Sequence, residues 1–231
     1  ALKRIRKEDG QVPEDVVREC ALLAEVNHPF VLQLVKTFET VNSIYILTEL
    51  ITGGELYAQM NERMGVVSRK HAQFYIGSLV LIMEALHQHG IIYRDLKPEN
   101  VMLDAQGYLK LVDFGLAKKL DGAQKTFSVV GTIYYMAPEV ITAKGYSFEA
   151  DFWSLGVMLF ELVCGGLPFG EECADDGGVV AAVIEEDLEF PARYNDNSGK
   201  KLIEGLLTKN PAGRLGAQGG WTQVKEHKFF K

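Results

Sequence analysis

The stretch that decides the fold is residues 91–115, IIYRDLKPENVMLDAQGYLKLVDFG. Two apolar runs in it, residues 101–103 and 109–112, stand on either side of a Gln-Gly pair at residues 106–107. Short apolar runs separated by a turn signal predict a β-hairpin. We therefore expect the middle of the chain to fold around a small hairpin.

Polar side chains crowd next to this hairpin. Asp95, Lys97 and Asn100 precede it, and Asp113 follows it. Polar groups beside buried strands cost stability unless they bind something. An Asp and an Asn that share a cation, next to a free carboxylate and an ammonium, are the groups that phosphoryl transfer from Mg-ATP requires. The stretch therefore predicts a site for Mg²⁺ and phosphate.

The composition is that of a folded protein. Of the 231 residues, 47% are hydrophobic and 24% are charged, which argues against disorder and suffices for one large core or two modest ones. The net charge of −7 argues against nucleic acid as the main partner and is compatible with a cationic one, although solubility alone explains it equally well.

The apolar runs and the cysteines predict a cytoplasmic protein without a membrane span. The most apolar run, residues 76–86, is too short to cross a bilayer, and no signal peptide opens the chain. The chain begins at Ala1 without an initiator Met, from which we expect it to be part of something longer. The three cysteines lack paired or metal-type spacing, which predicts reduced thiols: Cys20, Cys164 and Cys173.

The beginning of the chain predicts a small, strand-rich lobe. Residues 1–3 are expected to end a strand, Pro13 opens a helical pattern, and residues 31–38 and 43–50 predict a second hairpin. Glu19 falls within the helical pattern beside core positions. It either has a cationic partner there or is an ordinary solvated glutamate.

A hinge at residues 48–54 is expected to lead into a larger, mostly helical lobe. Ser68 can cap a helix that stops at residues 89–90, and a last helix is expected over residues 198–208. The polar residues 118–128 lack periodicity and predict a mobile loop.

Two acidic features of the larger lobe have simple structural explanations. Ser147 can cap a strongly apolar helix over residues 148–163, and Asp151 lies near its start, where the helix dipole favours a negative charge. Capping alone would explain Asp151. The many acidic residues in 171–189 predict a solvated acidic loop.

The order of the motifs resembles the signature set of the eukaryotic protein kinases. The set comprises Ala-x-Lys at residues 1–3, a helix glutamate at 19, Tyr-Arg-Asp-Leu-Lys-Pro-Glu-Asn at 93–100, Asp-Phe-Gly at 113–115 and Ala-Pro-Glu at 137–139. The tyrosine before Arg-Asp and the closing His-Lys-Phe-Phe resemble the AGC group of Ser/Thr kinases. The wording around Asp-Phe-Gly is most similar to cyclic-nucleotide-dependent kinases, the cGMP-dependent type especially.

The resemblance covers nearly the whole chain and implies an α+β, bilobal protein-kinase fold. A small antiparallel β lobe with one helix would span residues 1–50, and a larger, mostly helical lobe would span residues 51–231. The first strands and the Gly-rich loop that covers ATP would be missing, because no such motif precedes Ala1. The implied activity is ATP-dependent phosphorylation of Ser or Thr in proteins. Cyclic-nucleotide-binding regulatory domains outside this chain are one option that the resemblance raises.

The resemblance also implies a role for each motif residue. Asp95 would orient the substrate hydroxyl, and Lys97 would neutralise charge on the transferring phosphoryl group. Asn100 and Asp113 would ligate Mg²⁺. Lys3 would hold the phosphates of ATP, with Glu19 as its partner on the helix. Ala1, Thr48, Glu49, Ile51 and Met102 would surround the adenine, and Glu55 is a further ATP-binding residue.

Substrate choice is implied in the same way. Glu55, Glu99 and Glu161 match carboxylates that contact arginines upstream of the phosphorylated residue, so protein substrates with basic motifs are expected. Thr132 together with Lys97 fits Ser/Thr specificity.

Three further residues match the family pattern and one departs from it. Ser128 matches the activation-loop phosphosite, and a phosphate there would pair with Arg94. Glu139 and Arg214 match a buried pair that braces the larger lobe. Asp15 departs from the pattern, because a cationic residue often stands there and reaches toward the phosphosite.

Two rival functions are weighed against a protein kinase. A kinase fold that acts only as a scaffold is disfavoured because Lys3, Asp95, Asn100 and Asp113 are all present. A small-molecule kinase of related fold is disfavoured by the complete Ala-Pro-Glu segment and by the carboxylates that match peptide-binding positions.

Overall fold

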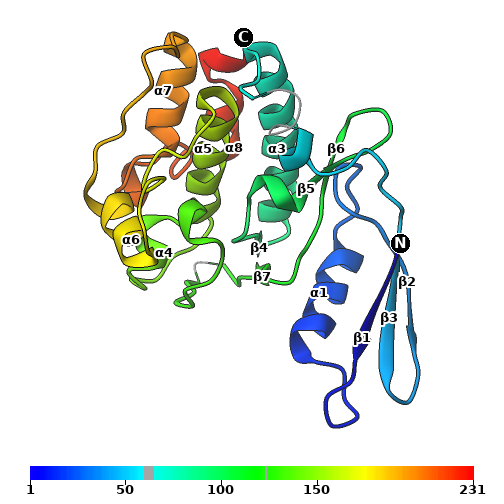
Figure 1. Cartoon of the computed structure of the whole chain (residues 1–231). Coiled ribbons are helices and arrows are strands. Elements are labelled where there is room, and N and C mark those ends of the chain that lie inside the picture. The colour runs from blue at the N-terminus through cyan, green and yellow to red at the C-terminus, as the bar shows by residue number, and fades with distance from the viewer. Residues whose placement is uncertain (60–64, 123) are drawn as a thin grey trace.

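The computed structural model describes residues 1–59, 65–122 and 124–231. The chain forms a small lobe with a three-stranded antiparallel sheet and one long helix, and a larger lobe that is mostly helical (Figure 1). Among the described residues, no helix is long and apolar enough to cross a membrane. The predicted α+β, bilobal architecture is confirmed.

The small sheet has the strand order β1-β3-β2. Strand β1 spans Leu2–Arg6, β2 spans Leu34–Glu39 and β3 spans Ser43–Thr48. The central strand β3 is antiparallel to both neighbours, so β2 and β3 form the hairpin that the sequence predicts.

Helix α1, Glu14–Glu25, covers one face of this sheet. It follows Pro13, whose fixed φ suits the start of a helix, and acidic residues occupy its first turn. Val16 of α1 packs with Ile44 and Ile46 of β3 to form the buried core of the small lobe. The other face of the sheet is not covered by α1.

Helix α5, Glu149–Cys164, is the centre of the larger lobe (Figure 1). All its residues except Glu149 and Glu161 are buried, and α3, Arg69–Gln88, and α7, Asn197–Leu206, pack against it. Because it is surrounded by protein, α5 needs no polar face.

The caps of these helices test the sequence predictions. The side chain of Ser68 caps α3 by accepting a hydrogen bond from the His71 N–H, as predicted. Ser147 does not cap α5, because Phe148 is the N-cap residue and makes no side-chain cap bond. The Ser147 N–H instead donates to the carboxylate of Glu149 at 3.3 Å.

The predicted central hairpin is confirmed. Strand β5, Val101–Leu103, pairs with β6, Leu109–Leu111, and Met102 lies opposite Lys110. The turn between them has Asp104 at its start, whose carboxylate accepts hydrogen bonds from two backbone N–H groups of the turn.

The other described elements are short. They are α2 Leu56–Gln59, α4 Pro138–Ile141, α6 Asp176–Glu185, α8 Gly220–Lys225, strands β4 Ile91–Ile92 and β7 Lys118–Lys119, and 3-10 turns Pro98–Asn100, Ile133–Tyr135, Pro211–Gly213 and Lys228–Phe230.

The prediction of a wholly solvated loop over residues 171–189 is wrong, because helix α6 lies within it. The side chain of Asp175 accepts a hydrogen bond from the Gly178 N–H and so caps α6. Val179, Ala182 and Val183 of α6 are buried. These three residues have helical spacing, but the many acidic residues around them made the segment read as a loop.

The predicted end of the helical lobe is also revised. The helix expected over residues 198–208 is α7, which starts one residue earlier and is capped by Asp196. It is not the last helix, since α8 begins at Gly220.

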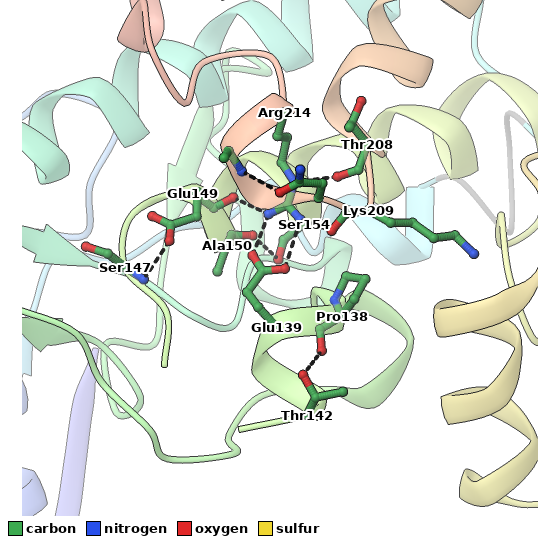
Figure 2. A network of polar contacts seen from close by, with 12 residues as sticks. Pro138, Glu139, Thr142, Ser147, Glu149, Ala150, Ser154, Thr208, Lys209 and Arg214 are labelled. Atoms are coloured by element: carbon green, nitrogen blue, oxygen red, sulfur yellow. Dashed lines mark hydrogen bonds and ion pairs between the residues drawn. The ribbon is translucent and has the colours of Figure 1, made fainter. Parts of the chain in front are cut away.

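Arg214 and Glu139 form a buried ion pair beside the start of α5 (Figure 2). The two guanidinium Nη atoms donate to the two carboxylate oxygens at 2.6 and 2.9 Å. The same guanidinium donates to the carbonyls of Glu149 and Thr208, and it lies 5.2 Å from the centre of the Trp153 ring. These contacts join α4, α5 and the segment after α7, so the predicted brace is present.

We predict that Arg214→Met lowers the free energy of unfolding by about 3–5 kcal/mol, because it leaves the Glu139 carboxylate buried without its partner. The measurement is urea unfolding followed by circular dichroism. Lys225→Gln is the control: it breaks an exposed pair with Glu84 and is expected to cost less than about 1 kcal/mol. Equal losses in the two variants would contradict the proposed brace.

Candidate active site

Four of the predicted site residues converge in the loop that follows β4 and in the segment around residue 132. Asp95 Oδ1 accepts hydrogen bonds from the Thr132 N–H at 3.1 Å and from Thr132 Oγ1 at 3.0 Å. Asp95 Oδ2 lies 3.1 Å from the Lys97 ammonium and accepts from the Asn100 amide at 2.8 Å. Lys97 also donates to Thr132 Oγ1 at 2.7 Å. Thr132 therefore bridges the Asp95 carboxylate and the Lys97 ammonium.

The backbone of this loop is held by Asp151, a residue whose importance the sequence analysis did not identify. Asp151 is completely buried. Its Oδ2 accepts from the Tyr93 N–H and its Oδ1 from the Arg94 N–H, both at 2.9 Å. Arg94 has a φ of +70°, a conformation that L-residues other than glycine seldom adopt. The carboxylate thus fixes a strained backbone immediately before Asp95.

A histidine orients Asp151 from the other side. His87 Nε2 lies 2.8 Å from Asp151 Oδ2, and the Trp221 indole N–H lies 2.9 Å from His87 Nδ1. An indole nitrogen only donates, so Nδ1 is the acceptor and Nε2 carries the proton that Asp151 accepts. The only sequence signal for this chain of contacts is an acid among the strongly apolar residues of the α5 helix.

The predicted metal ligands flank the central hairpin. Asn100 is buried at its start, and Asp113 is exposed just after β6. The Val112 N–H donates to the Asn100 carbonyl at 3.0 Å, which keeps the two ligand positions beside each other. One carboxylate and one amide oxygen are hard ligands that fit Mg²⁺, with water and phosphate oxygens as the remaining ligands. The donor set therefore suits the predicted ion.

Lys3 and Glu19 pair as predicted, with 3.1 Å between Lys3 Nζ and Glu19 Oε2. Glu19 is buried in α1, so the alternative of a solvated helix glutamate is excluded. Both residues line a cavity of about 250 Å³ that also contains Thr48 and Asp113. The cavity is therefore lined both by the small lobe and by the Asp-Phe-Gly segment.

The predicted adenine residues lie around the same region. Ala1 and Thr48 line the cavity, and the Thr48 N–H donates to the Ala1 carbonyl at 2.9 Å. The Glu49 N–H donates to the Gln33 carbonyl. Ile51 is half-buried in the connection between the lobes, and Met102 is half-buried on β5.

The predicted substrate carboxylates lie on the larger lobe. Glu55 is exposed and bridges to Met102, while Glu99 is exposed beside Asn100. Glu161 is half-buried on α5 and accepts a hydrogen bond from the Tyr135 hydroxyl at 2.6 Å.

The environment of Glu161 makes it harder to ionise. Burial raises its pKa, the hydrogen bond from Tyr135 opposes this rise, and the carboxylates of Glu99 and Glu171 add to it. Glu99 and Glu171 thus lie close enough to Glu161 to act on it electrostatically. Tyr135 and Glu171 are site candidates that the sequence analysis missed.

Ser128, the predicted phosphosite, is exposed, and Arg94 Nη1 donates to its hydroxyl at 2.9 Å. Thr126 Oγ1 lies 3.2 Å from the same hydroxyl and accepts from the Lys118 ammonium at 3.3 Å. Two cations therefore stand near Ser128 before any phosphate is added. Asp15, where the family pattern has a cationic residue, is exposed on α1.

The loop predicted over residues 118–128 has ordered contacts at both ends. Residues 118–119 form β7, and Thr126 is buried and bridges to Tyr146. Residue 123 lies outside the described residues.

A larger cavity, of about 490 Å³, lies between the start of α5 and the start of α8, with Phe148, Phe152 and Trp221 in its wall. Its lining contains none of the predicted catalytic, metal-binding or ATP-binding residues. The smaller cavity, which is lined by Lys3, Glu19 and Asp113, is therefore the candidate nucleotide site.

Residues 1–230 match the protein kinase domain. The chain belongs to the protein kinase family. It is 47% identical over 213 residues to a cGMP-dependent protein kinase of Plasmodium berghei (strain Anka), a match that covers 92% of this chain and 24% of the relative. A cGMP-dependent protein kinase of Toxoplasma gondii is 46% identical, with 92% and 21% covered. Ribosomal protein S6 kinase alpha-2 of Homo sapiens is 38% identical over 235 residues, with 100% and 31% covered.

These relatives confirm the prediction of a Ser/Thr protein kinase domain of the AGC group. The chain spans less than a quarter of the length of the two cGMP-dependent kinases, at 24% and 21%. Kinases of this family generally use ATP and Mg²⁺, which suits the donor set at Asn100 and Asp113.

We predict that Asp151→Ala exposes the backbone of residues 93–94, because two buried N–H groups lose their acceptor at about 1–3 kcal/mol each. The measurement is native-state hydrogen exchange, in which the Tyr93 and Arg94 amides should exchange at least about tenfold faster. Asp175→Ala is the control, since it removes only an exposed helix cap far along the chain. Unchanged protection of these two amides would refute the holding role of Asp151.

Proposed function

We propose that this protein transfers the γ-phosphoryl group of Mg-ATP to a serine or threonine hydroxyl in protein substrates with basic motifs. The observation that carries the proposal is the contact cluster in which Thr132 links Asp95 to Lys97. A carboxylate, an ammonium and a hydroxyl held within hydrogen-bond distance of one another suit the positioning of a second hydroxyl for in-line attack.

In this mechanism Asp95 accepts the proton of the substrate hydroxyl. Its two oxygens already accept from Thr132 and Asn100 and contact the Lys97 ammonium, so they have little remaining capacity. We infer that Lys97 turns from Asp95 Oδ2 toward the transferring phosphoryl group when substrate binds. This movement would free Oδ2 for the hydroxyl and would place the ammonium where negative charge develops.

Asn100 and Asp113 are the proposed ligands of Mg²⁺. The ion, when bound, neutralises charge on the phosphate oxygens. The Asn100 amide nitrogen donates to both the carbonyl and the carboxylate of Asp95, so the amide oxygen is turned away from Asp95. The same hydrogen bonds would fix the amide oxygen of Asn100, the proposed metal ligand, relative to the Asp95 carboxylate.

Lys3 is the proposed ligand of the α- and β-phosphates. Its ammonium is held at 3.1 Å by Glu19 of α1, so a shift of α1 would move the phosphate contact. We place the adenine between Ala1 and Met102, beside Thr48 and the backbone of Glu49 and Ile51. The lobes are proposed to divide at residue 50, with residues 1–50 and 51–231 on either side of the nucleotide.

We predict that Asp95→Asn reduces kcat by at least about 10²-fold, because the amide cannot accept the hydroxyl proton. The assay follows Mg²⁺-dependent transfer to an Arg-Arg-x-Ser peptide, and ATP affinity is measured in parallel. Asp104→Asn is the control, because Asp104 only shapes the hairpin turn. Wild-type protein that binds ATP but transfers no phosphate would favour a scaffold function instead.

The proposed peptide site is the carboxylate cluster of Glu99 and Glu161, with Glu55 as a further contact. Carboxylates bind the arginine fork with two parallel hydrogen bonds, which favours basic peptides. Cyclic-nucleotide-binding domains remain a proposed regulatory partner, since the relatives named above include cGMP-dependent kinases. The three free cysteines support a cytoplasmic location.

We predict that affinity for an arginine-containing peptide is pH-dependent through Glu161. Only the carboxylate form binds a guanidinium, and the raised pKa of Glu161 means that this form is lost at a higher pH than for an ordinary glutamate. KM for the arginine peptide should therefore rise as the pH falls through the pKa of Glu161.

Glu161→Gln is the matched variant. It should raise KM by about tenfold above that pH and remove this part of the pH dependence. A peptide that lacks the arginines serves as the control and should show neither effect. An unchanged KM–pH profile in Glu161→Gln would contradict the assignment.

Ser128 is the proposed regulatory phosphosite. A phosphate there would add about −1.5 to −2 charge units within reach of Arg94 and near Lys118. Since the Arg94 backbone directly precedes Asp95, the phosphate would stabilise the active loop.

We predict that Ser128→Ala lowers the single-turnover rate of phosphate transfer at least about tenfold relative to the Ser128-phosphorylated protein, because one or more charge-assisted hydrogen bonds are lost. Dephosphorylated wild-type protein is the control and should behave like Ser128→Ala. Equal rates in the phosphorylated protein and the variant would rule out this regulation.

A further inference from the structure

The face of the small sheet that points away from α1 ends in a basic cavity. Side chains alternate along a strand, and partners in an antiparallel pair point to the same face. Ile5 pairs with Ile44 on the face toward α1, so Arg4 and Arg6, with their partners Tyr45 and Ser43, point to the other face. This places two guanidinium groups on the solvent side of β1.

The cavity has a volume of about 340 Å³ and lies where β1 ends, between the turn that follows β1 and the turn between β2 and β3. The Lys7 N–H donates to the Asn42 carbonyl at 3.0 Å and joins the two turns. The cavity is lined by Arg4, Arg6, Lys7, Gly10, Val41 and Asn42. Its lining shares no residue with the cavity that contains Lys3 and Asp113.

Of the three cations of this cavity, only Lys7 has a carboxylate partner among the described residues. Lys7 pairs with Glu39 at 2.8 Å. Arg4 donates through Nε to the Ser43 hydroxyl at 3.1 Å, and its guanidinium lies 5.9 Å from the centre of the Tyr45 ring. Arg6 is exposed and has no hydrogen-bond or ion-pair partner in the part of the chain that the structure describes.

Local charge and net charge therefore have opposite signs here. The protein carries a net charge of −7, yet three cations from a four-residue stretch face one concavity. Acidic residues are nearby, since Glu8 and Asp9 follow in the turn, but neither lines the cavity and both are exposed. Like charges held together repel one another, and a bound anion removes that repulsion.

We propose that this cavity at the tip of the small lobe binds a ligand with clustered phosphate groups. The planar guanidinium groups match phosphate oxygens in pairs, and the Lys7 ammonium adds a compact charge. The cavity volume falls within the range of small-ligand sites, which is about 300–1,000 Å³. The phosphates belong either to a free polyphosphate or to a phosphorylated lipid headgroup. Val41, which is 85% exposed at the rim, would meet the membrane in the second case.

The first test is calorimetric titration with inorganic tripolyphosphate in a Lys3→Met background, which removes the ammonium of the candidate ATP site. Arg6→Gln should weaken binding at least about tenfold, because it removes charge-assisted hydrogen bonds without breaking a protein contact seen in the described chain. Arg4→Gln combined with Arg6→Gln should weaken it further. Thermal unfolding of each variant verifies that the sheet is intact.

The matched control is Lys36→Gln. Lys36 is an exposed cation of the same sheet that lies beside the Phe38 ring and does not line the cavity. It should leave tripolyphosphate affinity unchanged. Equal loss in Lys36→Gln and Arg6→Gln would show nonspecific attraction and overturn the proposal, as would an absence of tripolyphosphate binding.

The second test separates the two sources of phosphate. The chain is sedimented with phosphatidylcholine vesicles that contain or lack a phosphatidylinositol phosphate. Binding that requires the phosphorylated lipid, is lost in Arg6→Gln and is displaced by tripolyphosphate identifies a headgroup. Tripolyphosphate binding without vesicle binding identifies a free polyphosphate.

Discussion

The geometry of the active site depends on one buried carboxylate. Asp151 accepts hydrogen bonds from two successive backbone N–H groups and from His87, and no solvent reaches it. A left-handed backbone at a residue such as Arg94 costs roughly 1–3 kcal/mol, so it persists only where its surroundings hold it. The two hydrogen bonds that Asp151 accepts from the Tyr93 and Arg94 N–H groups hold this backbone in place. Asp95 is the next residue, so the orientation of its side chain depends on this backbone conformation.

Helix α5 positions other parts of the site through its first turns. The Ser154 hydroxyl donates to the Tyr135 carbonyl at 2.8 Å, which fixes the 3-10 turn just after Thr132. The Glu149 carbonyl accepts from Arg214, which brings the Arg214–Glu139 pair to the same end of the helix (Figure 2). Because α5 is buried nearly all round, these polar contacts share one rigid support. The loops that carry the chemistry can therefore keep a defined geometry although they have few stabilising contacts within themselves.

The sequence allowed prediction of those features that depend on local order. The hairpin at residues 101–111 and the Ser68 cap follow from turn and capping chemistry, and the motif spacing identifies Asp95, Asn100 and Asp113 as a group. Asp151 was not recognised, since its partners lie 57, 58 and 64 residues away and an acid in a first helical turn already has a local explanation. Helix α6 was missed for a related reason. Its buried Val179 and Val183 are outnumbered by acids, and only tertiary contact shows which side faces the core.

Local charge, rather than the net charge of −7, governs what each surface can bind. Glu99, Glu161 and Glu171 form an acidic cluster on the larger lobe, in which burial and repulsion from the other two carboxylates raise the pKa of Glu161. A cationic peptide would relieve that repulsion, as a polyphosphate would relieve the repulsion between Arg4 and Arg6 on the small lobe. At each cluster, Coulomb attraction favours a ligand of the opposite sign. A local basic cluster and a local acidic cluster thus coexist in a chain that is acidic as a whole.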